Sequence, residues 1–222
     1  MSNPSDHLAP HQIDADAASN QPVPVSRRSE RHRISRETDV RASLNLDGAG
    51  KAAISTSVPF LDHMLDSLTR HGRFDLEITA RGDTLVDDHH TVEDVGLVLG
   101  QAFLEALGNR HGIARFGSAY APMDDALARA VVDISGRPYL VFERNGVALA
   151  SRVGSFDTDL AEEFWRALVM ESRLTVHLDI LRARNAHHAL EALFKATGSA
   201  LHQASRVIDP SEGIPSTKGL LG

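Results

Sequence analysis

The stretch Asp87-Asp88-His89-His90-Thr91-Val92-Glu93-Asp94 has a related copy near the end of the chain, Asn185-Ala186-His187-His188-Ala189-Leu190-Glu191. Both copies contain two adjacent histidines and a glutamate in the pattern H-H-x-x-E. After each copy, apolar residues recur at every third or fourth position, which predicts an amphipathic helix that begins at the motif. Two helices that open with the same motif indicate a chain built of two related halves.

The spacing of this motif suits metal binding. On a helix the first histidine and the glutamate lie four positions apart, and the second histidine and the glutamate three, so each pair shares a face. The two adjacent histidines point about 100° apart, because an α-helix has about 3.6 residues per turn. One ion cannot easily take both, whereas two ions can take one each. A lone histidine is usually no ligand, but two copies of the motif favour a two-metal site.

The composition fits one modest-sized unit with a buried core. The chain has 222 residues, of which 42% are hydrophobic, enough for a substantial core. A net charge of −7 and the lack of a long basic run argue against a nucleic-acid partner. The absence of cysteine excludes disulfides and thiolate metal ligands. No apolar run approaches the ~18–20 residues of a membrane helix, so we expect a cytoplasmic protein without a membrane partner.

Composition and pattern divide the chain into four segments. Residues 1–30, rich in proline and polar residues, are predicted to form a disordered N-terminal tail. Residues 31–112 and 113–208 are the two predicted halves. Residues 209–222 contain two prolines and three glycines and are predicted to form a flexible C-terminal flap.

Each half is predicted to contain strands, a helix, a further strand and a motif helix. In the first half these are strands 38–46 and 51–58 joined as a hairpin, helix 59–72, strand 74–80 with a return strand at 84–86, and the motif helix to about 108. In the second half they are strands 114–123, 127–134 and 139–142, helix 157–170 capped by Asp157 or Thr158, strand 174–180, and the motif helix to about 205. This order predicts an α+β fold of duplicated halves, each an antiparallel sheet backed by two helices.

Longer segments carry a resemblance to a known family. They are PFLDHML at Pro59–Leu65, HG at His71-Gly72, DDHHTVEDVGLVLG at Asp87–Gly100, RFGSAYAPMDDAL, DISGRPYLVF, FDTDL, NAHHALEALFKA and PSTKG. From about Arg33 to Leu221, the sequence resembles imidazoleglycerol-phosphate dehydratase. The resemblance implies elimination of water from D-erythro-imidazole glycerol phosphate, giving imidazole acetol phosphate in histidine biosynthesis. It also implies a homo-oligomer of 24 subunits with manganese between subunits.

The resemblance assigns functional residues by their place in the motifs. It implies eight metal ligands: His63, His89, His90, Glu93, Glu163, His187, His188 and Glu191. It implies substrate contacts at Glu37, His71, Arg115, Arg137, Lys195, Ser216 and Lys218. The chain departs from the family pattern at four other positions, with Ala183 and Ser57 in place of glycine, and Asp125 and Asp159 in place of glutamate.

Glu163 is the least obvious of these ligands, and some family members have histidine there. It precedes His187 by 24 positions, much as His63 precedes His89 by 26, which fits equivalent places in two related halves. The neighbouring Glu162 is the competing candidate. A helix puts Glu163 at the edge of its apolar face and Glu162 on the polar side, so we expect Glu163 to be partly buried and Glu162 exposed.

The implied ligands suit manganese. Eight ligands over two metals give about four each, which leaves about two open positions per ion in a six-coordinate site. Imidazole and carboxylate ligands without sulfur favour Mn²⁺, with Zn²⁺, Fe²⁺ or Co²⁺ able to compete. The resemblance implies two Mn²⁺ per active site with the substrate imidazolate between them, where the ions act as Lewis acids.

Acid–base groups and a phosphate site complete the hypothesis. Glu37 is the candidate that helps hydroxide leave, and Glu191 or a metal-bound water is the candidate base. Four cationic side chains are expected to neutralise the substrate phosphate, namely Arg115, Arg137, Lys195 and Lys218. Ser216 would add a hydrogen bond as the flap closes. Taken singly, each of these side chains would be interpreted as a solvated surface group.

Two other classes of protein remain open at this point. A binuclear metallohydrolase usually has metals about 3.5–4 Å apart, typically with a bridging aspartate, whereas these motifs offer mainly terminal histidines. A metal-storage protein of the four-helix carboxylate type would be all-helical. The alternating strands predicted at 74–80 and 174–180 contradict that second class.

Overall fold

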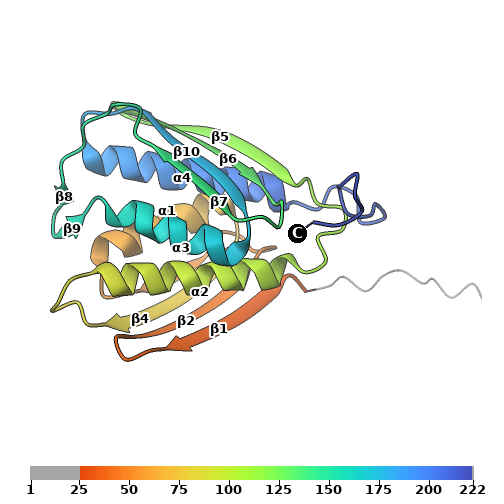
Figure 1. The fold of residues 1–222 in the computed structure, drawn as a ribbon, viewed down its shortest axis with the longest axis horizontal. Helices are drawn as coiled ribbons and strands as arrows, with labels where there is room; N and C mark the ends of the chain where they lie inside the picture. Colours follow the sequence, from red (N-terminus) through yellow and green to blue (C-terminus); the bar gives the residue numbers. More distant parts are fainter. Residues whose placement is uncertain (1–25, 222) are drawn as a thin grey trace, which may run out of the picture.

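The computed structural model describes residues 26–221 of the chain. The first half contains β1 (Arg28–Ile34), β2 (Thr38–Asn45), β3 (Ala52–Ser55), α1 (Pro59–Gly72), β4 (Asp75–Gly82) and α2 (His89–Leu107). The second half contains β5 (Phe116–Met123), β6 (Ala126–Asp133), β7 (Tyr139–Glu143), β8 (Arg152–Val153), β9 (Phe156–Asp157), α3 (Leu160–Ser172), β10 (Thr175–Arg182) and α4 (Ala186–Ser205). These helices lie between two sheets, one from each half (Figure 1).

The two sheets have the same topology, which confirms the predicted α+β fold of duplicated halves. The strand order is β1-β2-β4-β3 in the first sheet and β5-β6-β10-β7 in the second. In each sheet the first three strands are antiparallel, and the fourth joins the edge in parallel. Each sheet is therefore mixed, with one parallel edge strand that the sequence analysis did not predict.

The first helix shows how local sequence sets the elements. α1 begins at Pro59, whose fixed φ suits a first helical turn. Its apolar stripe, Leu61, Met64, Leu65 and Leu68, is buried. The helix ends at Gly72, and the capping residue Arg73 has a left-handed backbone with φ 55°. The predicted bounds of α1, α2 and α4 are confirmed to within about a turn.

Helices of one half pack on helices of the other. α1 packs on α4, and α3 packs on α2. A Cβ atom at Gly198 of α4 would lie 2.5 Å from the Leu68 carbonyl oxygen on α1. A Cβ atom at Gly100 of α2 would lie at the same distance from the Leu168 carbonyl oxygen on α3. Glycine at both crossings allows this close approach, so side chains of different halves meet in the middle layer.

Two strand predictions in the first half are wrong. The segment 51–58 does not form a hairpin with the strand before it, because β2 already has β1 and β4 on its two edges. Only Ala52–Ser55 is a strand, and it pairs in parallel with β4. Residues 84–86 form a turn with an exposed Leu85, not a return strand.

Two element boundaries also differ from the sequence analysis. β1 begins at Arg28, inside the predicted 1–30 tail, and only Ser29 of this strand is buried, so it has no apolar alternation to reveal it. Residues 1–25 of that tail lie outside the described residues. α3 begins at Leu160 and not at 157, because Phe156 and Asp157 form β9; the predicted cap at Asp157 or Thr158 is wrong, and Asp159 occupies that place.

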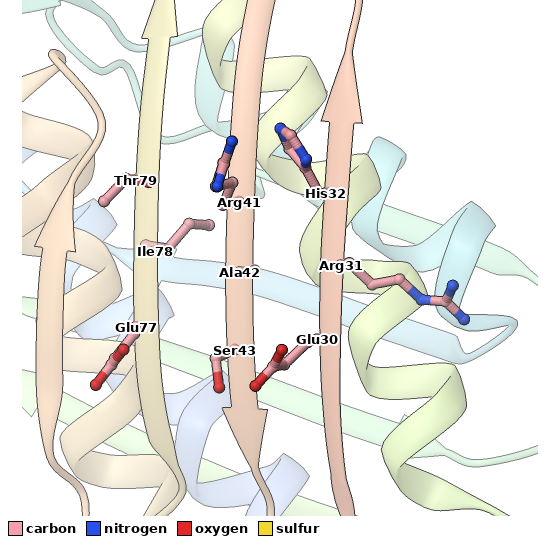
Figure 2. Close-up of a pocket in the computed structure, with 9 residues that line it drawn as sticks. All are labelled: Glu30, Arg31, His32, Arg41, Ala42, Ser43, Glu77, Ile78 and Thr79. Atoms are coloured by element: carbon pink, nitrogen blue, oxygen red, sulfur yellow. The ribbon is translucent and has the colours of Figure 1, made fainter.

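The outer faces of the two sheets differ in character. The first carries an open trough of about 560 Å³ lined by charged and polar side chains, among them Glu30, Arg41 and Glu77 on three neighbouring strands (Figure 2). The second exposes the aromatic rings of Phe116, Tyr120 and Tyr139. Among residues 26–221, no helix is both long and apolar enough to cross a membrane.

Candidate metal and active site

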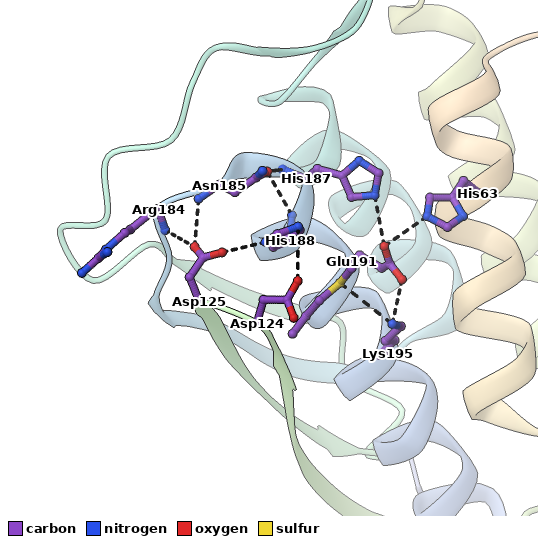
Figure 3. A network of polar contacts seen from close by, with 10 residues as sticks. His63, Asp124, Asp125, Arg184, Asn185, His187, His188, Glu191 and Lys195 are labelled. Atoms are coloured by element: carbon purple, nitrogen blue, oxygen red, sulfur yellow. Dashed lines mark hydrogen bonds and ion pairs between the residues drawn. The ribbon is translucent and has the colours of Figure 1, made fainter.

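A cluster of three predicted ligands forms where α1 meets α4. His63 comes from α1, and His187 and Glu191 come from one face of α4 (Figure 3). The Nε2 atoms of both histidines lie 3.1 Å from Oε2 of Glu191. One ligand atom from each residue lies within 4.8 Å of the others. Two nitrogens and a carboxylate oxygen at this separation fit a divalent transition metal.

The charge state of Glu191 suits a metal ligand. Its side chain is only 8% exposed, and Nζ of Lys195 lies 2.7 Å from its Oε1. Burial raises the pKa of Glu191, but hydrogen bonds from Lys195 and His63 outweigh burial and leave the pKa lowered. The carboxylate is therefore held ionised.

Two predicted substrate residues lie beside this cluster. Lys195 is one turn beyond Glu191 on α4. His71 lies two turns beyond His63 on α1. Burial and the positive charge of Lys195 lower the pKa of His71, which keeps its imidazole neutral. The candidate metal ligands thus lie near the neutral imidazole of His71 and the ammonium group of Lys195.

The second histidine of each motif points away from the first. The ring centroids of His187 and His188 are 6.2 Å apart, with ring planes at 77°. Those of His89 and His90 are 6.1 Å apart, with planes at 90°. The partners differ as well, since Nε2 of His187 lies 3.1 Å from Glu191 and Nδ1 of His188 lies 2.6 Å from Asp125. Adjacent histidines on the helix thus face different groups, as the helical geometry predicts.

The second histidine of each motif is held by an aspartate that the sequence analysis did not identify as functional. Nδ1 of His90 lies 3.1 Å from Oδ2 of Asp83, in the connection before α2. Nδ1 of His188 lies 2.6 Å from Oδ1 of Asp125, in the β5–β6 turn. Asp125 appeared only as a departure from the family pattern. A carboxylate in the connection just before the motif was the available signal for Asp83.

These contacts shift the pKa values of the paired groups. The hydrogen bond from His188, followed by those from the backbone N–H groups of Arg184 and Asn185, holds the pKa of Asp125 well below its usual range. The hydrogen bond to Asp83 raises the pKa of His90. Burial and the nearby charge of Asp87 raise the pKa of Asp88, at the start of α2.

The counterpart of the cluster in the first half is more open. Nε2 of His89 lies 3.8 Å from Oε2 of Glu93. Glu163 lies on α3, which packs on α2, and it is ten positions before the left-handed Arg173, as His63 is ten before the left-handed Arg73. Glu163 therefore occupies the place of His63, which supports its ligand role as a prediction.

The expected difference in burial between Glu162 and Glu163 is wrong. Their side chains are 35% and 38% exposed. Both carboxylates face Arg166, at 2.7 Å for Glu162 and 3.7 Å for Glu163. Burial therefore does not distinguish the two candidates, and neither does the charge partner, since both contact Arg166.

Glu37 lies in the β1–β2 turn beside the first motif. Its Oε2 is 3.9 Å from Nδ1 of His90, and its backbone carbonyl accepts the N–H of Asp83. The side chain is 53% exposed. Glu37 is thus anchored through its backbone while its carboxylate remains available to a ligand.

The remaining predicted phosphate residues lie at the far end of the second half. The backbone N–H of Arg115 donates to Ala204 near the end of α4, whereas His187 lies near its start. A helix of 20 residues is about 30 Å long. The Arg115 side chain binds Asp133 and donates to the Pro215 carbonyl at 2.9 Å, next to Ser216 in the predicted flap. Arg137 lies at the same end, because Thr175, which pairs with Asp133, donates to the Arg137 carbonyl. Lys218 follows in the flap, where its N–H donates to Oγ of Ser216.

The fold and the site define a class of protein. It is a duplicated α+β protein in which residues of both halves form one cluster of histidine and glutamate side chains suited to bind a metal ion. A family model described as imidazoleglycerol-phosphate dehydratase matches residues 56–201. The chain belongs to this family, as the resemblance implied. It is an enzyme, a hydro-lyase of histidine biosynthesis that acts on a small phosphorylated imidazole.

Relatives and solved structures agree with this assignment. Imidazoleglycerol-phosphate dehydratase of Aromatoleum aromaticum is 55% identical over 88% of this chain and 100% of its own length, and that of Ralstonia nicotianae is 53% identical over 89% and 100%. The crystal structure of the Staphylococcus aureus dehydratase is 44% identical, with a TM-score of 0.71 over 80% of this chain and 97% of its own. The Pyrococcus furiosus structure, determined with (S)-C348, is 37% identical, with a TM-score of 0.72 over 86% and 100%.

Proposed function

We propose that this enzyme converts D-erythro-imidazole glycerol phosphate to imidazole acetol phosphate at a site that holds two Mn²⁺ ions. The observation that carries the proposal is the cluster of His63, His187 and Glu191, in a chain of this family. Its nitrogen and oxygen ligands without sulfur suit Mn²⁺ among the divalent metals. The eight proposed ligands are His63, His89, His90, Glu93, Glu163, His187, His188 and Glu191.

Different residues of this chain would bind the metal, hold the substrate and transfer protons. Bound Mn²⁺ would supply Lewis acidity that stabilises negative charge on the substrate imidazole. Lys195 and His71 would hold the substrate beside the cluster, with the ammonium group neutralising phosphate. Glu37, exposed beside His90, would give a proton to the departing hydroxide. Glu191 is held ionised and would serve first as a ligand. The proton removed from carbon in the elimination would pass to Glu191 or to a water beside the cluster.

The active form would be a homo-oligomer, of 24 subunits if it follows the family resemblance. The phosphate residues near Arg115 lie about a helix length from His187 in the same chain. A second copy would therefore supply Arg115, Arg137, Ser216 and Lys218 to each site. The exposed Leu85 and Val86 in the connection before α2 support contacts between copies, and the metal-facing atoms of His90 and His188 would be available to a ligand set shared with another copy. We place the enzyme in the cytoplasm.

A dehydratase assay on metal-stripped protein tests the proposal. Stripped protein should form no ketone from imidazole glycerol phosphate, and added Mn²⁺ should restore ketone formation. Phosphate release is measured in the same samples, because a binuclear hydrolase would release phosphate and form no ketone. Full activity of the stripped protein would exclude the two-metal mechanism.

A further inference from the structure

The two sheets can be matched residue by residue through their strand pairing. Val40 of β2 pairs with Ala80 of β4, and Ala128 of β6 pairs with Ile180 of β10. β4 and β10 each begin two residues after a left-handed arginine, so they hold equivalent places. Val40 and Ala128 therefore correspond. Three positions earlier in each half, the match pairs Glu37 with Asp125.

These corresponding carboxylates behave differently toward the nearby histidine. In the second half, Oδ1 of Asp125 lies 2.6 Å from Nδ1 of His188. In the first half, Glu37 stays 3.9 Å from Nδ1 of His90, which Asp83 holds at 3.1 Å. The connection between β10 and α4 is Ala-Arg-Asn at 183–185 and has no carboxylate to take the place of Asp83. Asp125 therefore makes the contact to Nδ1 of His188 that Asp83 makes to Nδ1 of His90.

A carboxylate beside Nδ1 determines where a neutral imidazole carries its proton. An ionised carboxylate only accepts hydrogen bonds, so Nδ1 must carry the hydrogen. Nε2 then carries the free lone pair, and a metal can bind the ring through this atom. Metal-binding histidines in proteins are commonly oriented by such an outer carboxylate.

We propose that Asp83 and Asp125 are positioning residues that hold His90 and His188 in the Nδ1–H form and so present Nε2 of each to a metal. The metal part of this inference rests on the proposed function. Because Asp83 holds His90, Glu37 remains free for the substrate. The equivalent turn position thus serves the substrate in the first half and a ligand histidine in the second.

Asp125→Asn is the informative change, because the structure predicts which way the amide turns. Oδ2 of Asp125 accepts the backbone N–H groups of Arg184 and Asn185, at 2.5 and 3.0 Å. An asparagine oxygen would keep those two donors, so its NH₂ group would face His188 and donate to Nδ1. His188 would then carry its hydrogen on Nε2 and lose the lone pair that a metal needs. Asp125→Glu keeps a carboxylate and should restore the original form.

Asp83 calls for a different variant. Both of its oxygens face Nδ1 of His90, at 3.1 and 3.3 Å, and no backbone N–H among the described residues fixes either one. An asparagine could rotate to accept from Nδ1, so Asp83→Asn should have little effect. Asp83→Leu removes the acceptor for Nδ1 of His90 and leaves the contacts of Asp125 in the second half unchanged. Asp124→Asn is the control for loss of a nearby charge, because Asp124 is 78% exposed and lies 3.7 Å from Nε2 of His188, on the side of the ring away from Nδ1.

The test uses ¹⁵N spectra of histidine-labelled, metal-free full-length protein at alkaline pH, where imidazoles are neutral. The His188 and His90 signals are assigned by their loss in His188→Gln and His90→Gln. Wild type, Asp124→Asn and Asp125→Glu should show Nδ1–H at His188, and Asp125→Asn should show Nε2–H. Mn²⁺ titrations should show about a 10–100-fold loss of affinity in Asp125→Asn and Asp83→Leu, and less than about 3-fold in the control.

The outcomes separate this inference from the proposed function. An Asp125→Asn protein that keeps Nδ1–H, or that binds Mn²⁺ as wild type does, overturns the role of Asp125. If Asp125→Asn does not fold, Asp83→Leu decides through the His90 signal and Mn²⁺ affinity. A wild type that forms no ketone defeats the proposed function, while a reversed His188 signal in Asp125→Asn would still establish the positioning role.

Discussion

The two halves share a backbone plan but differ at the equivalent places that surround the ligands. In α1 and α3, His63 corresponds to Glu163, and three positions later Asp66 corresponds to Arg166. His63 reaches the ligands on α4, whereas Arg166 competes for the Glu163 carboxylate at 3.7 Å. The two halves thus have the same backbone arrangement, and substitutions at equivalent positions give their ligand clusters different surroundings.

The motif helices differ in the same way. In α4, the Asn185 side chain caps the helix by accepting from the N–H groups of His187 and His188. In α2, Asp88 makes no such bond. Lys195 of α4 corresponds to Leu97 of α2, because each lies four residues beyond the motif glutamate. Only the second half therefore places an ammonium group beside its motif.

Metal removal should have the largest effect on the protein, because metals would join the cluster of His63, His187 and Glu191 in one copy to His90 or His188 of another. Chelation should shift the particle to smaller species, and Mn²⁺ should restore the original size, as expected for ligand-linked assembly. Light scattering or sizing chromatography measures this. A particle of unchanged size after complete metal removal would contradict metal-linked assembly.

Lys195→Ala tests whether the ammonium group found only in the second half binds phosphate. Loss of a charged hydrogen bond, about 1.5–3 kcal/mol, should lower kcat/KM by about 10–150-fold, mainly through a higher KM. Metal content is measured as well, because Glu191 loses its 2.7 Å partner. Lys195→Arg should recover part of the loss. Wild-type kinetics in Lys195→Ala would remove Lys195 from the site.

Glu163 tests whether the two ligand clusters are equivalent. Glu163→Ala should lower Mn²⁺ affinity by about 10-fold or more, and Glu163→His should retain most of it, because imidazole is also a good ligand. Glu162→Ala is the matched control, since Glu162 has nearly the same exposure and the same arginine partner. Metal bound by the purified variants is measured at equal free Mn²⁺. Wild-type affinity in Glu163→Ala would mean that the eighth ligand is misassigned.

Gly198→Ala and Gly100→Ala test whether both helix crossings depend on the missing side chain. The added methyl group would lie 2.5 Å from a backbone carbonyl oxygen in each case, so we expect a loss of about 1–3 kcal/mol in the free energy of unfolding. Gly198→Ala should also weaken metal binding, because it displaces His63 from Glu191. Ser199→Ala, on the same helix, is the control. Denaturant unfolding of metal-free protein gives the values.

Asp75→Asn should have the smallest effect. The backbone N–H groups of Lys51 and Ala49 hydrogen-bond to the carboxylate and lower the pKa of Asp75. A folded-state pKa below the unfolded value gives stability that is present above about pH 4 and is lost as the pH falls. The contribution should be below about 1 kcal/mol, since the group is largely hydrated. The equivalent Thr175 is neutral, so Thr175→Val should leave the pH dependence of unfolding unchanged.

Local spacing along the chain by itself determined much of the site. A helical repeat of about 3.6 residues is enough to put His187 and Glu191 on one face and to turn His188 away. Alternation likewise predicted β4 and β10, because one face of each strand is buried. These properties depend on neighbours a few positions apart, so they can be read directly from the order of residues.

Contacts between distant segments required the tertiary structure. The sequence places His63 nearer the first motif, yet the glycine crossing of α1 on α4 joins it to Glu191 of the second. The parallel pairing of β3, the strand β1 and the partnership of Asp125 with His188 were equally hidden. Residue spacing determines which side chains share one face of a helix or strand. Which faces of different elements pack together depends on the whole chain, because many distant segments compete for the same buried surface.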